Sequence, residues 1–335
     1  MTNKIILIVF FVLSSTILLG YLKENFTLKE LNNPSTIIMN NEYIFIVDDS
    51  CIIKTYATKD YTFLKQIGRK GEGPGEFIGH IYPNFYKNQL LITSENKLSF
   101  FSLEGNLIKE KKQNLFDLAG IVKPIREKFV GTRMLSEDNY YIGYTLFNSE
   151  LKPLKELYRG KHYADKKTKK RGLFQICFFD TCKDRIVIAH HEGFVVEIFD
   201  YNGKSIKIIQ RKCAKIPFTK NDHNAIIKYW EIYPPYRFNV EFFKRVTIFP
   251  KNYPDILTCC VADNKIYIFT YMKKNADNKC FIYDLQGNYI KDIFIEIKML
   301  APNTVAPFTI YKEYFYQLTE DIEKETWILH KIKIK

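Results

Sequence analysis

Short hydrophobic runs of five to seven residues follow one another along most of this chain, separated by a few polar residues. Examples are "YIFIV" and "CIIKTYA" (43–57), "QLLIT" and "KLSFF" (89–101), "RIVIAH" and "FVVEIFD" (185–200), and "KIYIFTY" and "CFIYD" (265–284). Their residues alternate between apolar and polar or form short blocks rich in β-branched and aromatic side chains, which is typical of β-strands. The pattern therefore predicts an all-β protein.

Three segments align with one another: "FSLEGNLIK" (101–109), "FDYNGKSIK" (199–207) and "YDLQGNYIK" (283–291), with weaker copies at 56–65 and 147–155. Each copy has the pattern of a strand, a tight turn and a second strand, and glycine supplies the positive φ that such turns need. With the turn position at Asp60, Gly105, Leu151, Gly203 and Gly287, the steps are 45, 46, 52 and 84 residues. A period near 45 to 50 residues indicates a propeller or a solenoid.

Further runs precede each of these hairpins, so that each repeat contains four short strands, here called A to D in chain order. Four-stranded units around an axis are the blades of a β-propeller. The last unit shows only three strands, and we expect "NFTLKEL" (25–31) to supply its outermost strand, which closes the ring and removes an exposed edge. We predict a six-bladed β-propeller over residues 25–335, with a long insertion at 211–255 between blades 4 and 5.

A glycine-rich stretch, "KQIGRKGEGPGEFIGHIYP" (65–83), has two interpretations. A phosphate-binding loop would need a Gly-Lys-Ser or Gly-Lys-Thr motif at the start of a helix, and neither occurs here. The alternative is a crossing from the outer strand of blade 1 to the inner strand of blade 2, in which glycines permit a crowded path. We favour the crossing, with Phe77 between the blades and with Glu76 and His80 delivered to one face.

The motif "IGRKGEGPGEF", followed by strands, and the repeated D-x-x-G-x-x-I turns resemble the exported bacterial six-bladed β-propellers that have NHL-like or TolB-like repeats. The resemblance covers about residues 25–335. It implies a fold and an extracytoplasmic location, and it implies no particular reaction.

The N-terminal segment is the one part of the chain that has the pattern of a targeting signal. Lys4 precedes "IILIVFFVLSSTILLGYL", and Lys23 follows it. Residues 1–24 are predicted to be a signal peptide or an N-terminal membrane anchor, because the apolar run is long for a cleaved signal and just long enough to span a bilayer. The rest of the protein is expected outside the cytoplasm, periplasmic, secreted or anchored, with no other contact with the membrane.

Charge and cysteine content narrow the function classes. The formal net charge is +13, but Lys greatly outnumbers Arg, the residue that reads bases and phosphates bidentately, so we do not expect nucleic-acid binding. Seven cysteines cannot all pair within one chain. Cys177 and Cys182 have the spacing of a small disulfide ring, and the alternative is that the cysteines are free core residues. No C-x-x-C pair occurs, so no structural zinc site is predicted.

The long connections are expected on one face of the propeller. B-to-C and D-to-A connections share a face, and these are the long ones, at 68–80, 113–124, 157–172, 211–255 and 272–278. Binding residues concentrate on long loops held by a rigid scaffold. The candidate ligand-binding residues on this long-loop face, around the channel mouth, are Arg69, Glu76, His80, Lys166, Lys167, Lys169, Lys170, His191, Trp230, Tyr233, Tyr236 and Arg237.

Each group of candidates also has a purely structural interpretation. The basic run 159–171 would favour an anionic ligand, or would be a solvated charge run. The aromatic residues of the insertion would stack on sugars or contact a partner, or would fix the insertion to the scaffold. Long loops in general also cover core surface.

Two functions from different classes follow. The first is a non-catalytic binding or scaffold protein of the extracytoplasmic space, whose long-loop face engages an anionic glycan or an envelope protein, with no cofactor. The alternative is a metal-dependent hydrolase or lyase at the mouth of the channel, with His80 and His190 or His191, and also His223, as the candidate histidines. No G-x-S-x-G motif and no regular metal-ligand spacing supports catalysis, so we favour the binding protein.

Overall fold

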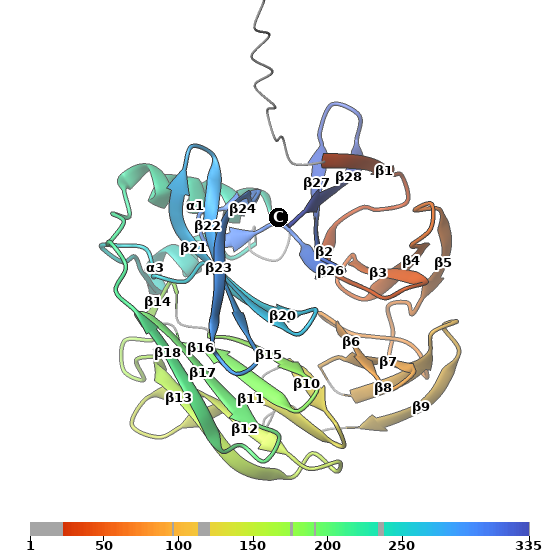
Figure 1. The fold of residues 1–335 in the computed structure, drawn as a ribbon, viewed down its shortest axis with the longest axis horizontal. Coiled ribbons are helices and arrows are strands. Elements are labelled where there is room, and N and C mark those ends of the chain that lie inside the picture. The colour runs from red at the N-terminus through yellow and green to blue at the C-terminus, as the bar shows by residue number, and fades with distance from the viewer. Residues whose placement is uncertain are drawn as a thin grey trace, which may run out of the picture.

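The computed structural model describes residues 23–95, 97–112, 121–174, 177–190, 192–233 and 238–334. Six four-stranded antiparallel sheets surround a central channel (Figure 1). The predicted six-bladed β-propeller is therefore confirmed. In blades 1 to 5 the first strand in chain order lies at the channel and the last lies at the rim.

Blades 1 to 3 follow one another without interruption. Blade 1 consists of β2 (Pro34–Met39), β3 (Tyr43–Asp48), β4 (Ile52–Ala57) and β5 (Phe63–Ile67). Blade 2 consists of β6 (Tyr82–Tyr86), β7 (Gln89–Thr93), β8 (Lys97–Ser102) and β9 (Leu107–Lys112). Blade 3 consists of β10 (Val122–Ile125), β11 (Lys128–Ser136), β12 (Tyr140–Phe147) and β13 (Pro153–Ala164).

Blades 4 to 6 complete the ring. Blade 4 consists of β15 (Phe178–Cys182), β16 (Arg185–Ala189), β17 (Phe194–Asp200) and β18 (Ser205–Arg211). Blade 5 consists of β20 (Thr258–Ala262), β21 (Lys265–Lys274), β22 (Asp277–Asp284) and β23 (Tyr289–Glu296). Blade 6 has β26 (Phe308–Tyr311), β27 (Tyr314–Asp321) and β28 (Thr326–Lys333), and β1 (Lys23–Leu28) is its outermost strand.

The ring closes as the sequence predicts, through a strand from the opposite end of the chain. β1 pairs with β28 from Lys23 opposite Ile332 to Leu28 opposite Trp327. The strand begins two residues before the expected one, at Lys23. The chain then crosses to blade 1, where the buried carboxylate of Asp48 accepts a hydrogen bond of 2.7 Å from the backbone N–H of Asn33.

The hydrophobic core is divided among the seams between neighbouring blades. One cluster, for example, contains Phe45 and Ile53 of blade 1 together with Leu90 and Phe101 of blade 2. Phe77 is completely buried in this cluster, which confirms its predicted place between the blades. Gly68 has a φ of 77°, and a Cβ atom there would lie 2.6 Å from the Phe77 ring. The glycine-rich stretch is therefore a crowded blade-to-blade crossing.

The C-to-D turns have the recurring geometry that the repeats predict, with one correction. Gly105, Leu151, Gly203 and Gly287 all have positive φ values. In blade 1, however, the residue with positive φ is Tyr61, with a φ of 61°, and not Asp60. The blade 1 turn is one residue longer than the turn of blade 2, so the position with positive φ lies one residue later than the repeat pattern predicts.

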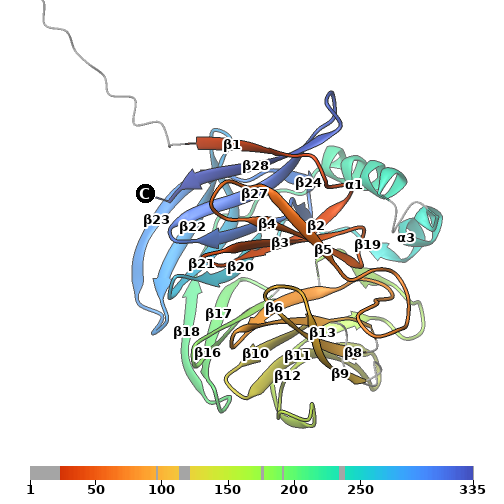
Figure 2. The same cartoon turned by 90° about the vertical axis from the view of Figure 1, so that its right-hand side faces the viewer.

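The connection between β18 and β20 builds a separate layer on one face. It contains α1 (Lys220–Ile232), α3 (Val240–Val246) and β19 (Thr247–Ile248). β19 pairs in parallel with β14 (Arg171–Gly172) from the blade 3 to blade 4 connection. The short hairpin of β24 (Met299–Ala301) and β25 (Thr304–Val305) adds to this layer, and α1 contacts β24. Figure 2 shows both helices on one side of the molecule.

Candidate functional site

The long-loop face is the face that carries α1 and α3 (Figure 2). The D-to-A connections meet there because every inner strand starts at this face. The opposite face carries the short A-to-B and C-to-D turns. Of the expected long connections, residues 113–120 lie outside the described part of the chain, as do the candidates His191, Tyr236 and Arg237.

Arg69 and Glu76 hold the glycine-rich crossing together. The Glu76 carboxylate accepts a hydrogen bond of 2.9 Å from the Gly73 backbone N–H and lies 2.6 Å from the Arg69 guanidinium. The Gly73 amide, followed by Arg69, lowers the pKa of Glu76. His80 packs beside Tyr82 with ring centroids 4.9 Å apart, and burial lowers its pKa. All three residues are placed on the expected face, and the contacts of Arg69 and Glu76 are internal to the crossing.

A buried ion pair supports the same crossing, and sequence reasoning missed it. The Lys97 ammonium lies 2.9 Å from the Glu110 carboxylate, and only 5% of the Lys97 side chain is exposed. Lys97 also donates to the Gly73 carbonyl at 2.9 Å, and Glu110 accepts from the Gly75 N–H at 3.2 Å. These bonds join the crossing to blade 2, so Lys97 is a structural residue of the site.

The basic segment lies at the rim of the long-loop face, after the outer strand of blade 3. Lys166 and Lys169 place their ammonium groups 5.7 and 5.3 Å from the centre of the Tyr140 ring. Lys166 also donates to the Glu137 carbonyl. Lys167, Lys169 and Lys170 are exposed. The candidates at 166–170 therefore form one continuous positively charged turn, as the sequence suggests.

The insertion has its own small hydrophobic core. Trp230 is only 5% exposed and packs with Ile226 of α1 and with residues of α3 and its flanking segments. Tyr233 is half-buried and stacks on Tyr229, with ring centroids 5.0 Å apart. The contacts of Trp230 therefore agree with the structural interpretation, in which the aromatic residues fix the insertion to the scaffold.

The parallel pair β14 and β19 joins the basic turn to the insertion. Arg171, which directly follows Lys170, pairs with Thr247 and lies over the Phe243 ring of α3 at 5.3 Å. Beside this junction Phe242 and Ile248 are 47% and 54% exposed. A pocket of about 520 Å³ lies under it, lined by the two connections and the B-to-C turn of blade 4. A basic and an apolar surface thus become neighbours here.

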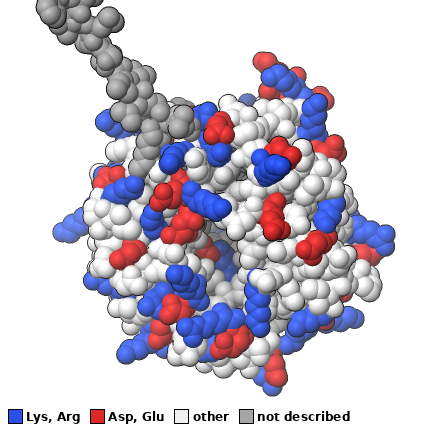
Figure 3. Space-filling model, turned by 45° about the vertical axis from the view of Figure 1, so that its right-hand side comes forward, with Lys and Arg blue, Asp and Glu red and all other residues white. Residues whose placement is uncertain are grey.

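The central channel is a cavity of about 970 Å³. It is lined by the inner strands of all six blades, and it extends to the A-to-B turns at Lys87, Arg126 and Lys183. The space-filling view shows a hollow with charged side chains of both signs around it (Figure 3). The channel therefore reaches the short-turn face.

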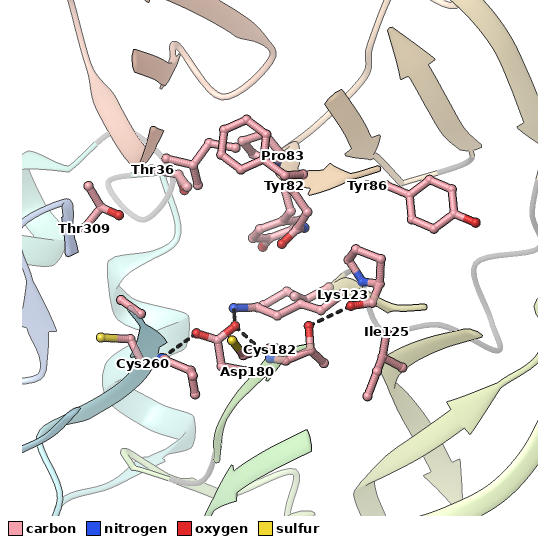
Figure 4. A pocket seen from close by; sticks show the side chains of 18 of the residues that line it. Thr36, Tyr82, Pro83, Tyr86, Lys123, Ile125, Asp180, Cys182, Cys260 and Thr309 are labelled. Atoms are coloured by element: carbon pink, nitrogen blue, oxygen red, sulfur yellow. Dashed lines mark hydrogen bonds and ion pairs between the residues drawn. The ribbon is translucent and has the colours of Figure 1, made fainter. Parts of the chain in front are cut away.

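Polar contacts link neighbouring blades across the channel wall (Figure 4). The Lys123 ammonium of blade 3 lies 2.8 Å from the Asp180 carboxylate of blade 4. The other oxygen of Asp180 accepts a hydrogen bond of 2.8 Å from the Val261 N–H of blade 5. Asn84 of blade 2 donates to the Val122 carbonyl of blade 3 at 3.2 Å. Four consecutive blades are joined in this way, so Asp180 is part of the wall as well as of the cavity lining.

The candidate histidines pack locally on aromatic rings. His190 stacks on Tyr158 with ring centroids 3.9 Å apart. His223 packs edge-on against Phe249 with ring centroids 3.8 Å apart. Within the described residues, no group of three or more His, Cys, Asp or Glu side chains converges in a way that could hold a metal ion. All seven cysteines have free thiols. Burial raises the pKa of Cys182 and of Cys260, which line the channel.

No helix in the described segments combines the length and the apolar character that a membrane-spanning helix requires. The apolar run 5–22 lies outside those segments.

Comparisons with known proteins give the fold alone. No family model matches the chain, and no curated protein matches it. Among solved structures, a candidate exported protein of Bacteroides fragilis is 14% identical, with a TM-score of 0.52 over 93% of this chain and 95% of that one. The structure of U3-55K is 10% identical, with a TM-score of 0.50 over 92% of this chain and 98% of that one. At such identities the similarity shows a shared propeller architecture.

Proposed function

We propose that this protein is a non-catalytic binding or scaffold protein of the extracytoplasmic space, and that its long-loop face docks an acidic protein of the cell envelope. It would be one of the exported propellers with NHL-like or TolB-like repeats. The location rests on the sequence of residues 1–24, as a signal peptide or an anchor. The fold supports a binding role, because a propeller is a rigid scaffold for loops.

One observation carries the proposal: the basic turn and the exposed apolar residues are joined by the β14–β19 pair. Isolated exposed apolar side chains are ordinary, but an apolar patch beside a charge cluster is typical of protein interfaces. Ile232, Phe242 and Ile248 are all about half exposed or more, at 65%, 47% and 54%. The basic turn would increase the rate of association with a negatively charged partner, and the Phe242 side chain would supply contact area.

An acidic protein fits this surface better than an anionic glycan. A sugar ring could stack on Phe242, but it would leave the exposed aliphatic side chains of Ile232 and Ile248 beside it without contacts. A protein partner can cover both the ammonium groups and the apolar side chains. The complex should weaken at high salt because exposed charges are screened over about 8–10 Å at physiological ionic strength.

The test uses matched charge reversals on the two faces. Lys167→Glu with Lys170→Glu, and separately Phe242→Ser, should each weaken capture of one acidic envelope protein by about tenfold or more, which corresponds to ~1.4 kcal/mol. The control is Lys152→Glu with Lys204→Glu, which makes the same charge change in two C-to-D turns on the other face. Captured material is identified by mass spectrometry with and without protease. Equal capture by all variants would contradict the proposal, and protease-resistant, sugar-containing material would show a glycan ligand instead.

A further inference from the structure

The C-to-D turn of blade 1, at the seam with blade 6, differs from the C-to-D turns of blades 2, 4 and 5. In blades 2, 4 and 5 the turn residue with positive φ is glycine, at Gly105, Gly203 and Gly287. In blade 1 the same position is Tyr61, defined by the Ala57 N–H that bonds across the turn to the Thr62 carbonyl. A bulky residue with positive φ is uncommon and carries strain, and such outliers concentrate at functional positions.

The glycines close their seams. A Cβ atom on Gly105 would lie 2.8 Å from Ile67 of blade 1, and one on Gly203 would lie 2.6 Å from Leu157 of blade 3. One on Gly287 would lie 2.7 Å from the Lys207 side chain of blade 4. The turn backbone therefore sits directly against the preceding blade, and no side chain fits between them.

At the seam between blades 6 and 1, a pocket of about 360 Å³ takes the place of this contact. The Tyr61 ring forms one wall and stacks on Phe26 of β1 with ring centroids 3.8 Å apart. Tyr311, Tyr314 and Tyr316 of blade 6 also line the pocket. Figure 1 shows β1 and β28 beside blade 1, so both ends of the chain build this pocket. Its size lies within the range of small-molecule sites, roughly 300–1,000 Å³.

The charges that line the pocket favour an anion. Lys59, Lys312 and Lys331 contribute three ammonium groups, and Glu24 contributes the one carboxylate of the lining. Glu24 is engaged with Lys331 at 3.1 Å. Lys331 also lies over the Tyr314 ring at 4.7 Å. Lys59 and Lys312 stand on the two turns that form the rim, one from each blade, and both are exposed.

We propose that this seam pocket binds an acidic saccharide unit, meaning a sugar ring with a carboxylate or sulfate group. The aromatic side chains offer apolar surface for the C–H face of such a ring. The phenol groups and Asn41, whose side chain contacts the Tyr311 hydroxyl, offer hydrogen bonds to sugar hydroxyls. Lys59 and Lys312 offer charge-assisted hydrogen bonds to the acidic group. A bare inorganic ion would use the ammonium groups without needing the aromatic walls.

Occupation of the pocket would also stabilise the closure of the ring. Phe26 and Glu24 belong to β1, whereas Tyr61 and Lys59 belong to blade 1, so the pocket exists only while β1 is in place. A ligand that binds only the closed ring raises its stability by mass action. The pocket lies on the short-turn face, so the outcome of its test is independent of the proposed protein interface.

The test is a calorimetric titration of the folded protein with digalacturonic acid, with neutral digalactose and inorganic phosphate as comparison probes. Tyr61→Gly introduces the residue of blades 2, 4 and 5, which relieves the strain of the positive φ and removes the aromatic wall. Leu151→Gly is the matched control, because it makes the same change at the same turn position of blade 3. We expect saturable binding of digalacturonic acid that Tyr61→Gly weakens at least tenfold and that Leu151→Gly leaves unchanged.

Lys59→Gln combined with Lys312→Gln provides a second test that leaves the backbone unchanged. This double variant should bind digalacturonic acid more weakly while it remains folded. Slower hydrogen exchange of the β1 amides in the presence of the acidic probe is the expected structural readout. Equal binding of digalactose would overturn the acidic specificity. If phosphate competes with digalacturonic acid equally well in the unchanged protein and in Tyr61→Gly, the pocket is only an anion site and the saccharide proposal is overturned. The absence of saturable binding up to about 10 mM would overturn the site itself.

Discussion

The ammonium group of Lys155, on the outer strand of blade 3, donates a hydrogen bond of 2.7 Å to the carbonyl of Gly203 in the C-to-D turn of blade 4. Lys65 makes the same contact with the Glu104 carbonyl of blade 2. In these two repeats the lysine that ends the hairpin segment thus reaches the next blade and donates to a turn carbonyl there. The turns that accept these bonds contain Gly203 and Gly105. Because glycine has no Cβ atom, each turn can lie close enough to the preceding blade for the bond to form.

The first prediction separates the two roles of these glycines. Gly203→Ala should destabilise the protein by about 2–3 kcal/mol, because it combines a strained positive φ with a clash against Leu157. Gly193→Ala is the control, since its φ is 69° but the nearest contact of its Cβ would be an ordinary 3.7 Å. It should cost about 1 kcal/mol from φ strain alone. Urea unfolding midpoints measure both, and equal losses would show that close approach is unimportant.

The second prediction concerns the buried pair Lys97 and Glu110. Lys97→Met should destabilise the protein by about 3–5 kcal/mol because it leaves a largely buried carboxylate without its cation. Lys97→Met combined with Glu110→Gln should cost less than the single change, because glutamine keeps an acceptor without the charge. Arg69→Met, in the exposed pair of the same crossing, should cost less than about 1 kcal/mol.

The same pair predicts an acid sensitivity. Burial opposes ionisation of Glu110, but hydrogen bonds from Lys97, Ser99 and Gly75 outweigh it and lower the Glu110 pKa. A carboxylate with a depressed pKa stabilises the fold above its unfolded pKa, about 4.3, and this stabilisation is lost as the pH falls through the lower folded value. Unfolding midpoints at pH 3 and pH 6 should differ less in Glu110→Gln than in the unchanged protein. An identical difference in both proteins would contradict this role.

The third prediction concerns pH and ring closure. The His330 ring contacts Asn25 of β1 and Thr319, each at 2.7 Å. Burial, helped by Lys23 and Lys298, lowers the His330 pKa to about 4. The unfolded chain, with a histidine pKa of about 6.5, binds a proton that the folded chain excludes between these values. Stability from this group should therefore be complete above about pH 6.5 and decline toward pH 4. Protection of the β1 amides from hydrogen exchange, relative to their intrinsic exchange rates at each pH, should fall as the pH drops over this range. Protection that does not change with pH would refute the assignment.

The fourth prediction concerns the cysteines. All seven thiols are free in the structure, including Cys177 and Cys182. Alkylation of the non-reduced protein under denaturing conditions should label all seven, as counted by mass spectrometry. Labelling of two fewer would reveal a disulfide ring. In the native protein Cys259 and Cys280 should react very slowly, because they are buried and burial raises the pKa of both thiols.

Features that depend on nearby residues were the ones that sequence reasoning recovered. Gly105, Gly203 and Gly287 reveal the hairpins because positive φ is a requirement of a single position. Phe77 was placed correctly because a large apolar side chain in a glycine-rich crossing must be covered. The basic turn at 166–170 was recognisable because its charges are consecutive. Tyr61 was missed by one residue because the blade 1 turn is longer, and no glycine marks it.

Features that depend on several blades were not recoverable. Lys123 and Asp180 are 57 residues apart in the chain, and they meet only because their inner strands are neighbours around the axis. The burial of Trp230 follows from the core that the insertion forms with the flanking connections, which no local pattern reports.

By itself the sequence determined six blades and the basic turn, because strand periodicity, turn chemistry and consecutive charges are local properties, and it determined the closing strand because the last repeat has one strand too few. The tertiary structure alone decided which face the channel hollow reaches, which lysines reach a neighbouring blade and which seam holds a pocket. Those features arise between residues that are distant in the chain and are brought together only when the ring closes.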